Sequence, residues 1–159
     1  ALVKYVNEAL SEQKKKQQSP GEDDKSILYN DLDTESSDID KEYEINKQVF
    51  QKLDSLIRRD ELYLSADLSR EDLVRMAHMN NTRFAKMIKE NTGTNLSGYI
   101  NELRLNHAIH LLKEHPEYTL RAIAEASGIN SMPTFHSLFK NKTGMTPSEF
   151  KKTQMDMKQ

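Results

Sequence analysis

The chain has 159 residues, of which 36% are hydrophobic and 30% charged, so it is long enough for one globular domain with additional segments. It contains no cysteine, which excludes disulfides, thiolate zinc sites and cysteine nucleophiles. No run of about 18 apolar residues occurs, so we expect no membrane span within this sequence. A cytoplasmic location is expected, either for a free protein or for the cytoplasmic part of a membrane-anchored one.

The net charge of −2 hides a segregation of charge along the chain. Residues 1–60 contain 10 basic and 14 acidic residues, whereas residues 61–159 contain 13 basic and 11 acidic ones. Residues 131–159 are the most basic part, with five lysines and two acids. The small positive surplus of the second part fits a neutral globular domain as well as a nucleic-acid-binding one.

The N-terminal segment, residues 1–40, is predicted to carry little tertiary structure. A short helix over residues 1–12 has an apolar face made of Leu2, Val3, Val6, Ala9 and Leu10. A helix of this length is marginal in water, so it needs a partner or continues an element upstream. Residues 17–40 are polar and acidic, which predicts a flexible linker.

A helix is predicted next, within residues 41–66. Its apolar positions recur at helical spacing as far as Arg58-Arg59, and they are Tyr43, Val49, Phe50, Leu53, Leu56 and Ile57. Helical patterns then continue to Lys152, with no segment of sustained alternation between apolar and polar residues. The predicted fold class is therefore all-α.

The second part contains a weak internal repeat. Residues 84–93 match residues 135–144, because Phe, Lys, Thr and Gly recur at an offset of 51 positions. Each copy is predicted to begin with a short amphipathic helix, at 71–78 and at 120–127, which a tight break separates from a second helix. Two short helices joined by a tight turn make a helix-turn-helix, so the sequence predicts two such units.

The turns and caps of the two copies correspond. Gly128 is expected to adopt a positive φ in the second turn, where the first copy carries the less suitable His78. The second helices are expected to begin at Asn/Ser caps, near Asn80-Asn81 and Asn130-Ser131, and to end at Gly93 and Gly144. In a helix-turn-helix, the second helix is the one that enters a major groove of DNA.

A longer helix is predicted between the copies, from about Leu96 to Glu114. Its buried face consists of Tyr99, Ile100, Leu103, Ala108, Ile109, Leu111 and Leu112. This linker helix is expected to hold the units at the separation of roughly 34 Å that two major-groove faces of one duplex require. Thr146, Pro147 and Glu149 then form a capping box that starts a last helix, before a tail at 154–159.

These motifs resemble the AraC/XylS-type DNA-binding domain over about 67–153. The matching residues are I-A-E-A-S-G-I at 123–129, T-F-H-S-L-F-K at 134–140, T-G-M-T-P-S-E-F at 143–150 and Y-I-N-E-L-R-L-N-H-A at 99–108. The resemblance implies a DNA-binding unit of about seven helices that places two recognition helices in successive major grooves of an asymmetric site. The N-terminal part resembles linkers of membrane-linked sensor-regulators of a Bacteroidetes type.

The resemblance also implies which residues contact DNA. The base-reading positions carried across are Asn81, Thr82, Ala85 and Lys86 in the first unit, and Met132, Pro133, His136 and Ser137 in the second. Arg83, Ser131 and Lys140 complete the predicted set, and Lys142 is a further candidate for a phosphate contact.

The second recognition helix departs from the family pattern at two positions. Ser137 stands where many members have an arginine, which removes a guanine contact. Pro133 lies in the first turn of the helix and lacks a backbone donor. We therefore expect the second unit to depend more on phosphate contacts and DNA shape than on base edges.

Other conspicuous residues have structural interpretations. Arg104, in the middle of the linker helix, is expected to bridge the two units through hydrogen bonds. The phenylalanines at 84, 135, 139 and 150 are expected in the core. His107 and His110 have a spacing that suits a metal, but no motif supplies a third ligand, so no metal site is predicted.

The sequence thus predicts a sequence-specific transcription regulator that binds double-stranded DNA and needs no cofactor. RNA polymerase and a sensor or effector domain outside this chain are the other expected partners. The alternative is a helical protein-interaction module that keeps the fold without specific DNA reading. The acids at 22–44 belong either to a solvated linker or to a segment that mimics DNA and inhibits the domain. No enzyme motif is present.

Overall fold

The computed structural model describes residues 31–159, with side chains from residue 37 onward. All regular structure in this range is helical, which confirms the predicted fold class. The described residues form two compact units, one made of 31–55 and 70–93 and the other of 56–69 and 94–159. The predicted helix at 1–12 and most of the predicted linker lie outside the described residues. Within 31–159, no helix is both long and apolar enough to cross a bilayer.

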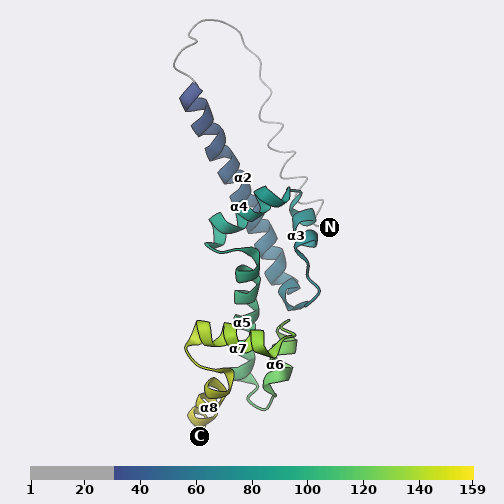
Figure 1. The fold of residues 1–159 in the computed structure, drawn as a ribbon, viewed down its shortest axis with the longest axis vertical. Helices are drawn as coiled ribbons and strands as arrows, with labels where there is room; N and C mark the ends of the chain where they lie inside the picture. Colours follow the sequence, from purple (N-terminus) through teal and green to yellow (C-terminus); the bar gives the residue numbers. More distant parts are fainter. Residues whose placement is uncertain (1–30) are drawn as a thin grey trace, which may run out of the picture. The chain divides into compact units, whose positions relative to one another are not determined.

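The first described helix, α2, runs from Asp31 to Arg59 (Figure 1). The prediction that the linker extends to residue 40 is therefore wrong for residues 31–40, which are helical. Residues 31–40 contain neither proline nor glycine, the two residues that are least favourable inside a helix, so their sequence permits α2 to begin before residue 41. Its last turn carries Arg58 and Arg59, and positive charge at a helix C-terminus is favoured by the helix dipole.

The first unit contains the first helix-turn-helix, formed by α3 (Arg70–Ala77) and α4 (Asn81–Thr92). The turn between them depends on His78, whose φ of 51° is in the left-handed region as expected. The Asn80 side chain accepts a hydrogen bond from the backbone N–H of Arg83 and caps α4. Gly93, with a φ of 75°, ends α4 and donates its N–H to the carbonyl of Lys89. These caps are the ones that the sequence predicts.

The second unit contains the short 3-10 helix η2 (Leu62–Leu64), α5 (Leu96–Glu114), α6 (Leu120–Ala126), α7 (Met132–Thr143) and α8 (Pro147–Met157). Helix α5 has the predicted bounds and contacts η2, α6, α7 and α8, so it is the central element of this unit (Figure 1). The predicted capping box at Thr146 and Glu149 is present. Helix α8 continues to Met157, so most of the predicted tail is helical.

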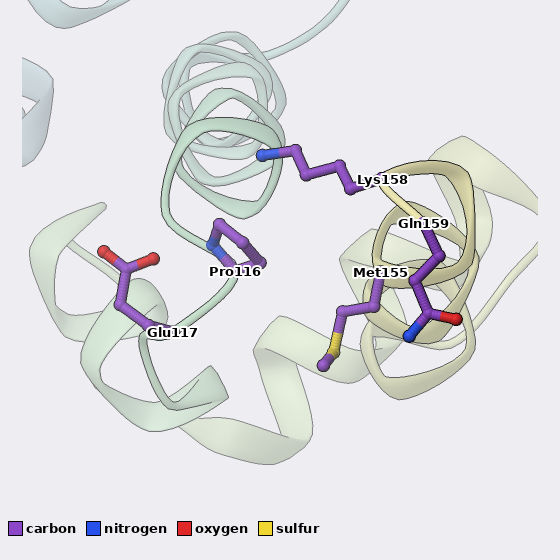
Figure 2. Close-up of a pocket in the computed structure, with 5 residues that line it drawn as sticks. All are labelled: Pro116, Glu117, Met155, Lys158 and Gln159. Carbon is purple, nitrogen blue, oxygen red and sulfur yellow. The ribbon is translucent and has the colours of Figure 1, made fainter.

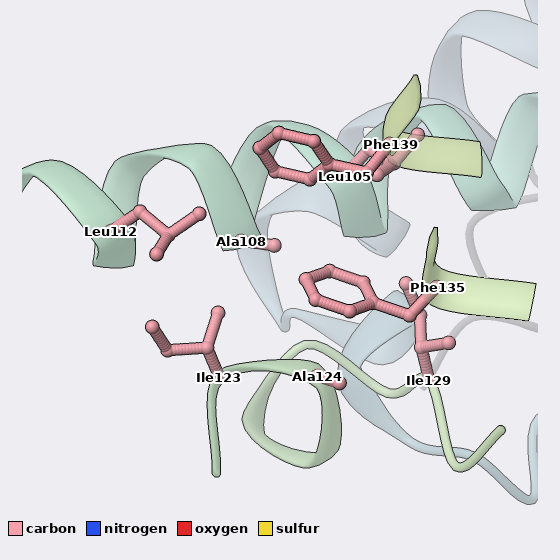
Figure 3. Close-up of a cluster of buried hydrophobic side chains, with 8 residues drawn as sticks. All are labelled: Leu105, Ala108, Leu112, Ile123, Ala124, Ile129, Phe135 and Phe139. Carbon is pink, nitrogen blue, oxygen red and sulfur yellow. The ribbon is translucent and has the colours of Figure 1, made fainter. Parts of the chain in front are cut away.

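The core of the second unit holds α5, α6 and α7 together. Phe135 and Phe139 of α7 are fully buried and meet edge to face, with ring centroids 5.7 Å apart. Figure 3 shows Phe135 between α5 and the α6 segment. Phe139 belongs to the same cluster, whose other buried side chains are Leu105, Ala108, Leu112, Ile123, Ala124 and Ile129. Burial of these apolar side chains fixes the rotation of α7 about its axis and leaves the opposite face of the helix exposed to solvent.

Candidate nucleic-acid interface

Helix α4 has one buried and one exposed face. Phe84, Met87 and Ile88 are buried and fix the rotation of the helix about its axis. The centre of the opposite face carries the exposed Thr82, Ala85, Lys86 and Lys89. Lys89 was not among the predicted contacts, although its spacing from Ala85 and Lys86 already places it on the same helix face. Its ammonium group donates to the carbonyl of Gly93 at the end of the helix.

The two other predicted contacts on α4 lie at the edges of this face. Asn81 is exposed in the first helical turn, where its carbonyl accepts a 3.3 Å hydrogen bond from Nη2 of Arg70. Arg83 is half-buried, and its Nε donates to Oδ1 of Asn46 of α2 at 2.9 Å. Neither Arg70 nor Asn46 was predicted, because their roles depend on contacts between separate helices.

Lys86 lies on the exposed α4 face with two acidic side chains beside it. Its Nζ lies 3.8 Å from Oε1 of Glu42 of α2 and 3.9 Å from Oε1 of Glu90 one turn further along α4. Both pairs are exposed, so each stabilises the fold by no more than about 1 kcal/mol. They do reduce the positive potential that Lys86 presents to a polyanion.

Helix α7 likewise exposes the face opposite its phenylalanines. The predicted contacts Pro133, Ser137 and Lys140 are all exposed on it. Ser131 is exposed at the start of the helix, where its Oγ caps α7 by accepting from the backbone N–H and the hydroxyl of Thr134. Thr134 and Asn141 share the exposed face and were not predicted. Their helical spacing from Ser137 already places them on the same face of α7 in the sequence.

Three candidates on α7 are placed less favourably for contact with a ligand. Met132 is half-buried and packs against the hydrophobic core of the second unit. His136 is half-buried, with its ring edge to face with Phe135 at a centroid distance of 6.2 Å. Lys142 pairs with Glu102 of α5 at 3.3 Å, which satisfies its charge within the fold.

Arg104 makes hydrogen bonds within the fold, but they do not form the predicted bridge between the two helix-turn-helix units. Its Nε donates to the carbonyl of Tyr63 at 2.7 Å, and its Nη2 donates to the carbonyl of Ser65 at 2.9 Å. It therefore ties α5 to the η2 segment of its own unit rather than bridging the two helix-turn-helix units. Burial lowers the pKa of Arg104, but a guanidinium stays charged at neutral pH.

A shallow hollow of about 330 Å³ lies at the end of α8, lined by Pro116, Glu117, Met155, Lys158 and Gln159 (Figure 2). Its charged groups already have partners, since Glu117 pairs with His115 and Lys158 donates to the carbonyl of Lys113. Across residues 31–159, no group of three or more acidic or histidine side chains is placed to hold a metal ion. The exposed faces of α4 and α7 are therefore the stronger candidates for function.

Comparisons with known proteins identify helix-turn-helix relatives of the chain. A family model described as a helix-turn-helix domain matches residues 73–153, just over half of the chain. The uncharacterized transcriptional regulatory protein YesN of Bacillus subtilis is 39% identical over 80 residues, which are 50% of this chain and 22% of that protein. The transcriptional activator RclR of Escherichia coli is 31% identical over 81 residues, which are 51% of this chain and 28% of that protein.

Solved structures show the same fold. A transcriptional regulator from Chromobacterium violaceum, described as containing an AraC-type DNA-binding domain, is 31% identical, with a TM-score of 0.50 over 55% of this chain and 77% of that one. The C-terminal domain of the response regulator yesN from Fusobacterium nucleatum has a TM-score of 0.58 over 65% of this chain and 98% of that one, and at 22% identity it shows the fold alone.

The chain spans only 22% and 28% of the lengths of the two curated relatives described above. The matched part contains both helix-turn-helix units and the linker helix between them. Its relatives are transcriptional regulators and not enzymes. The chain belongs to the AraC-type helix-turn-helix family of transcription regulators.

Proposed function

We propose that this chain binds double-stranded DNA sequence-specifically, with α4 and α7 in successive major grooves of an asymmetric site. The observation that carries the proposal is the construction of α4. Its apolar face is fully buried and both its ends are capped, while the opposite face exposes Lys86 and Lys89 beside the small residues Thr82 and Ala85. A helix of this kind fits a major groove, with lysines for phosphates or guanines and small side chains that permit close approach.

The two helices are proposed to contribute differently. The predicted contacts that α7 exposes, Pro133, Ser137 and Lys140, offer one cation and one hydroxyl group to base edges. We assign most base discrimination to α4, and to α7 a larger share of phosphate and shape-dependent contacts. The predicted roles of Met132 and His136 in base reading are the weakest of the set, because both side chains are half-buried against the core.

The test begins with selection of binding sites from random duplex DNA, followed by affinity measurements over a range of salt concentrations. Several phosphate contacts make the affinity fall steeply with salt, and a specific binder prefers its selected site over random DNA. Weak binding that is equal for all duplexes would instead support the protein-interaction module.

Lys86→Ala examines the reading helix directly. It should weaken binding to the selected site by about 1–3 kcal/mol and relax base preference near its contact. The matched control is Lys52→Ala, which removes an exposed lysine from α2 and should leave base preference unchanged. If both variants bind like the parent, α4 is not the reading helix.

Control by a sensor or effector domain, and contact with RNA polymerase, are proposed on the basis of family membership. Transcription in vitro from a promoter that carries the selected site tests the second proposal. The expected result is a change in transcript level that requires both the site and the protein.

A further inference from the structure

Asn46 is a fully buried polar residue in the first unit, on the face of α2 that meets α4. Its Oδ1 accepts the 2.9 Å hydrogen bond from Nε of Arg83. A guanidinium can only donate, so this bond fixes which way the amide points. The other side of the amide, Nδ2, has no hydrogen-bond partner among the residues that the structure describes.

This arrangement costs stability. A buried donor without a partner loses its bonds to water and gains nothing in return. A leucine has nearly the same shape as asparagine and would fill the same space without an unsatisfied group. The Asn46 amide therefore packs less favourably than an apolar side chain would. Its favourable contribution is the hydrogen bond that its Oδ1 accepts from Arg83.

The hydrogen bond leaves the far end of Arg83 available. Within the described part of the chain, Nη1 and Nη2 of Arg83 make no hydrogen bond, and the side chain is half-buried rather than exposed. Arg83 lies at the edge of the α4 face whose centre is occupied by Thr82 and Lys86. For a helix in a major groove, the centre of the exposed face meets base edges and its edge meets the sugar-phosphate wall.

We propose that Asn46 is a positioning residue that holds Arg83 as a clamp for one phosphate of the DNA backbone. The inference rests on the proposed DNA-binding function and deepens it. The two Nη groups form a planar pair of donors that suits phosphate oxygens, and anchoring Nε reduces the conformational freedom that binding would otherwise remove. Arg83 thereby supplies affinity that is independent of base sequence, while its neighbours on α4 read the bases.

Three variants test the proposal: Asn46→Leu, Arg83→Met and the double variant. Arg83→Met should lower affinity by about tenfold, keep the preferred sequence and reduce the salt slope by about one. Asn46→Leu should lower affinity by about fivefold while its melting temperature stays equal to the parent's or rises. The double variant should bind like Arg83→Met alone, because Asn46 acts only through Arg83.

A scan with single methylphosphonate substitutions identifies the phosphate. One neutralised phosphate should weaken the parent markedly, Asn46→Leu less and Arg83→Met not at all. Val49→Ala, a change of a buried apolar residue of α2, is the control for loss of stability, and it should keep the parental pattern of the scan. If Asn46→Leu fails to fold, Asn46→Ala takes its place in the same scan.

The proposal is overturned if Asn46→Leu binds as tightly as the parent, or if it causes the same loss in the Arg83→Met background. It is also overturned if no single phosphate distinguishes Arg83→Met from the parent. These results differ from failure of the proposed function, in which the parent itself shows neither a preferred sequence nor a steep salt dependence.

Discussion

Arg104 of α5 donates a 2.7 Å hydrogen bond from its Nε to the backbone carbonyl of Tyr63, which lies 41 positions earlier in the chain. Its Nη2 also donates to the carbonyl of Ser65, so one guanidinium satisfies two carbonyls of the η2 segment. A residue in the middle of the linker helix thus holds the segment that follows α2 against α5 within the second unit.

Arg104→Met should lower the free energy of unfolding by about 1–2 kcal/mol, because it leaves both carbonyls without their charged donor. Denaturant unfolding followed by circular dichroism measures the change. Arg121→Met is the matched control, since Arg121 makes an exposed pair with Glu125 on its own helix and its loss should change stability little. Equal effects of the two substitutions would show that the Tyr63 and Ser65 bonds contribute nothing measurable.

A side chain at Gly128, in the second helix-turn-helix, should destabilise the fold. Its φ is 81°, and a Cβ would lie 2.8 Å from the carbonyl oxygen of Tyr63 and 2.9 Å from that of Leu64. Gly93 has a similar φ of 75°, but a Cβ there meets nothing within 4 Å. Gly93→Ala should therefore cost only the backbone strain of about 1 kcal/mol, and Gly128→Ala about 2 kcal/mol or more. Thermal unfolding compares them, and similar costs would argue against close packing at the turn.

Glu42→Gln should strengthen DNA binding by about twofold at low salt, because it removes one of the two acids beside Lys86. Glu44→Gln is the control, since it removes the same charge from an exposed position two residues along α2. The difference between the two variants should shrink as salt screens the exposed pair. Indistinguishable affinities at all salt concentrations would mean that Glu42 does not compete with DNA for Lys86.

Ser137→Arg should give α7 a base contact that the parent lacks. Ser137 is exposed on the face opposite Phe135 and Phe139, and an arginine there can donate two bonds to a guanine, worth about 1–3 kcal/mol of discrimination. Asn141→Arg adds the same charge one turn later and should raise affinity without a new base preference. Repeated site selection distinguishes them; a selected sequence unchanged by Ser137→Arg would place α7 away from base edges.

The α8 capping box predicts a pH dependence of stability. Hydrogen bonds from the backbone N–H and the side chain of Thr146 hold the pKa of Glu149 below its ordinary value of 4.5. A carboxylate whose pKa is depressed by folding stabilises the native state above the ordinary value, and this contribution is lost as the pH falls through the native pKa. Stability should therefore decline more steeply below about pH 4.5 in the parent than in Glu149→Gln. Parallel pH profiles in denaturant unfolding would contradict the assignment.

The elements nearest the repeat were predictable because their signals are local. Caps at Asn80, Ser131 and Thr146 need only a short polar side chain before a helix, and Gly93 and Gly144 need only a positive φ after one. The sequence alone thus predicted two helix-turn-helix units and the bounds of the linker helix. The predicted DNA contacts on α7 included Met132 and His136, which are half-buried in the structure. The predicted N-terminal limit of α2 is wrong, because residues 31–40 are helical although they are polar and acidic; they contain neither proline nor glycine.

Contacts between elements far apart in the sequence depended on tertiary structure. Asn46 and Arg83 are 37 positions apart, and Lys142 and Glu102 are 40 apart, so no periodicity links them. The rotation of α7 that turns Met132 and His136 toward the core is set by how Phe135 and Phe139 pack between other helices. Helical spacing in the sequence determined that this chain has two candidate reading helices. Packing decided which of their polar side chains are committed to the fold and which are left for a ligand.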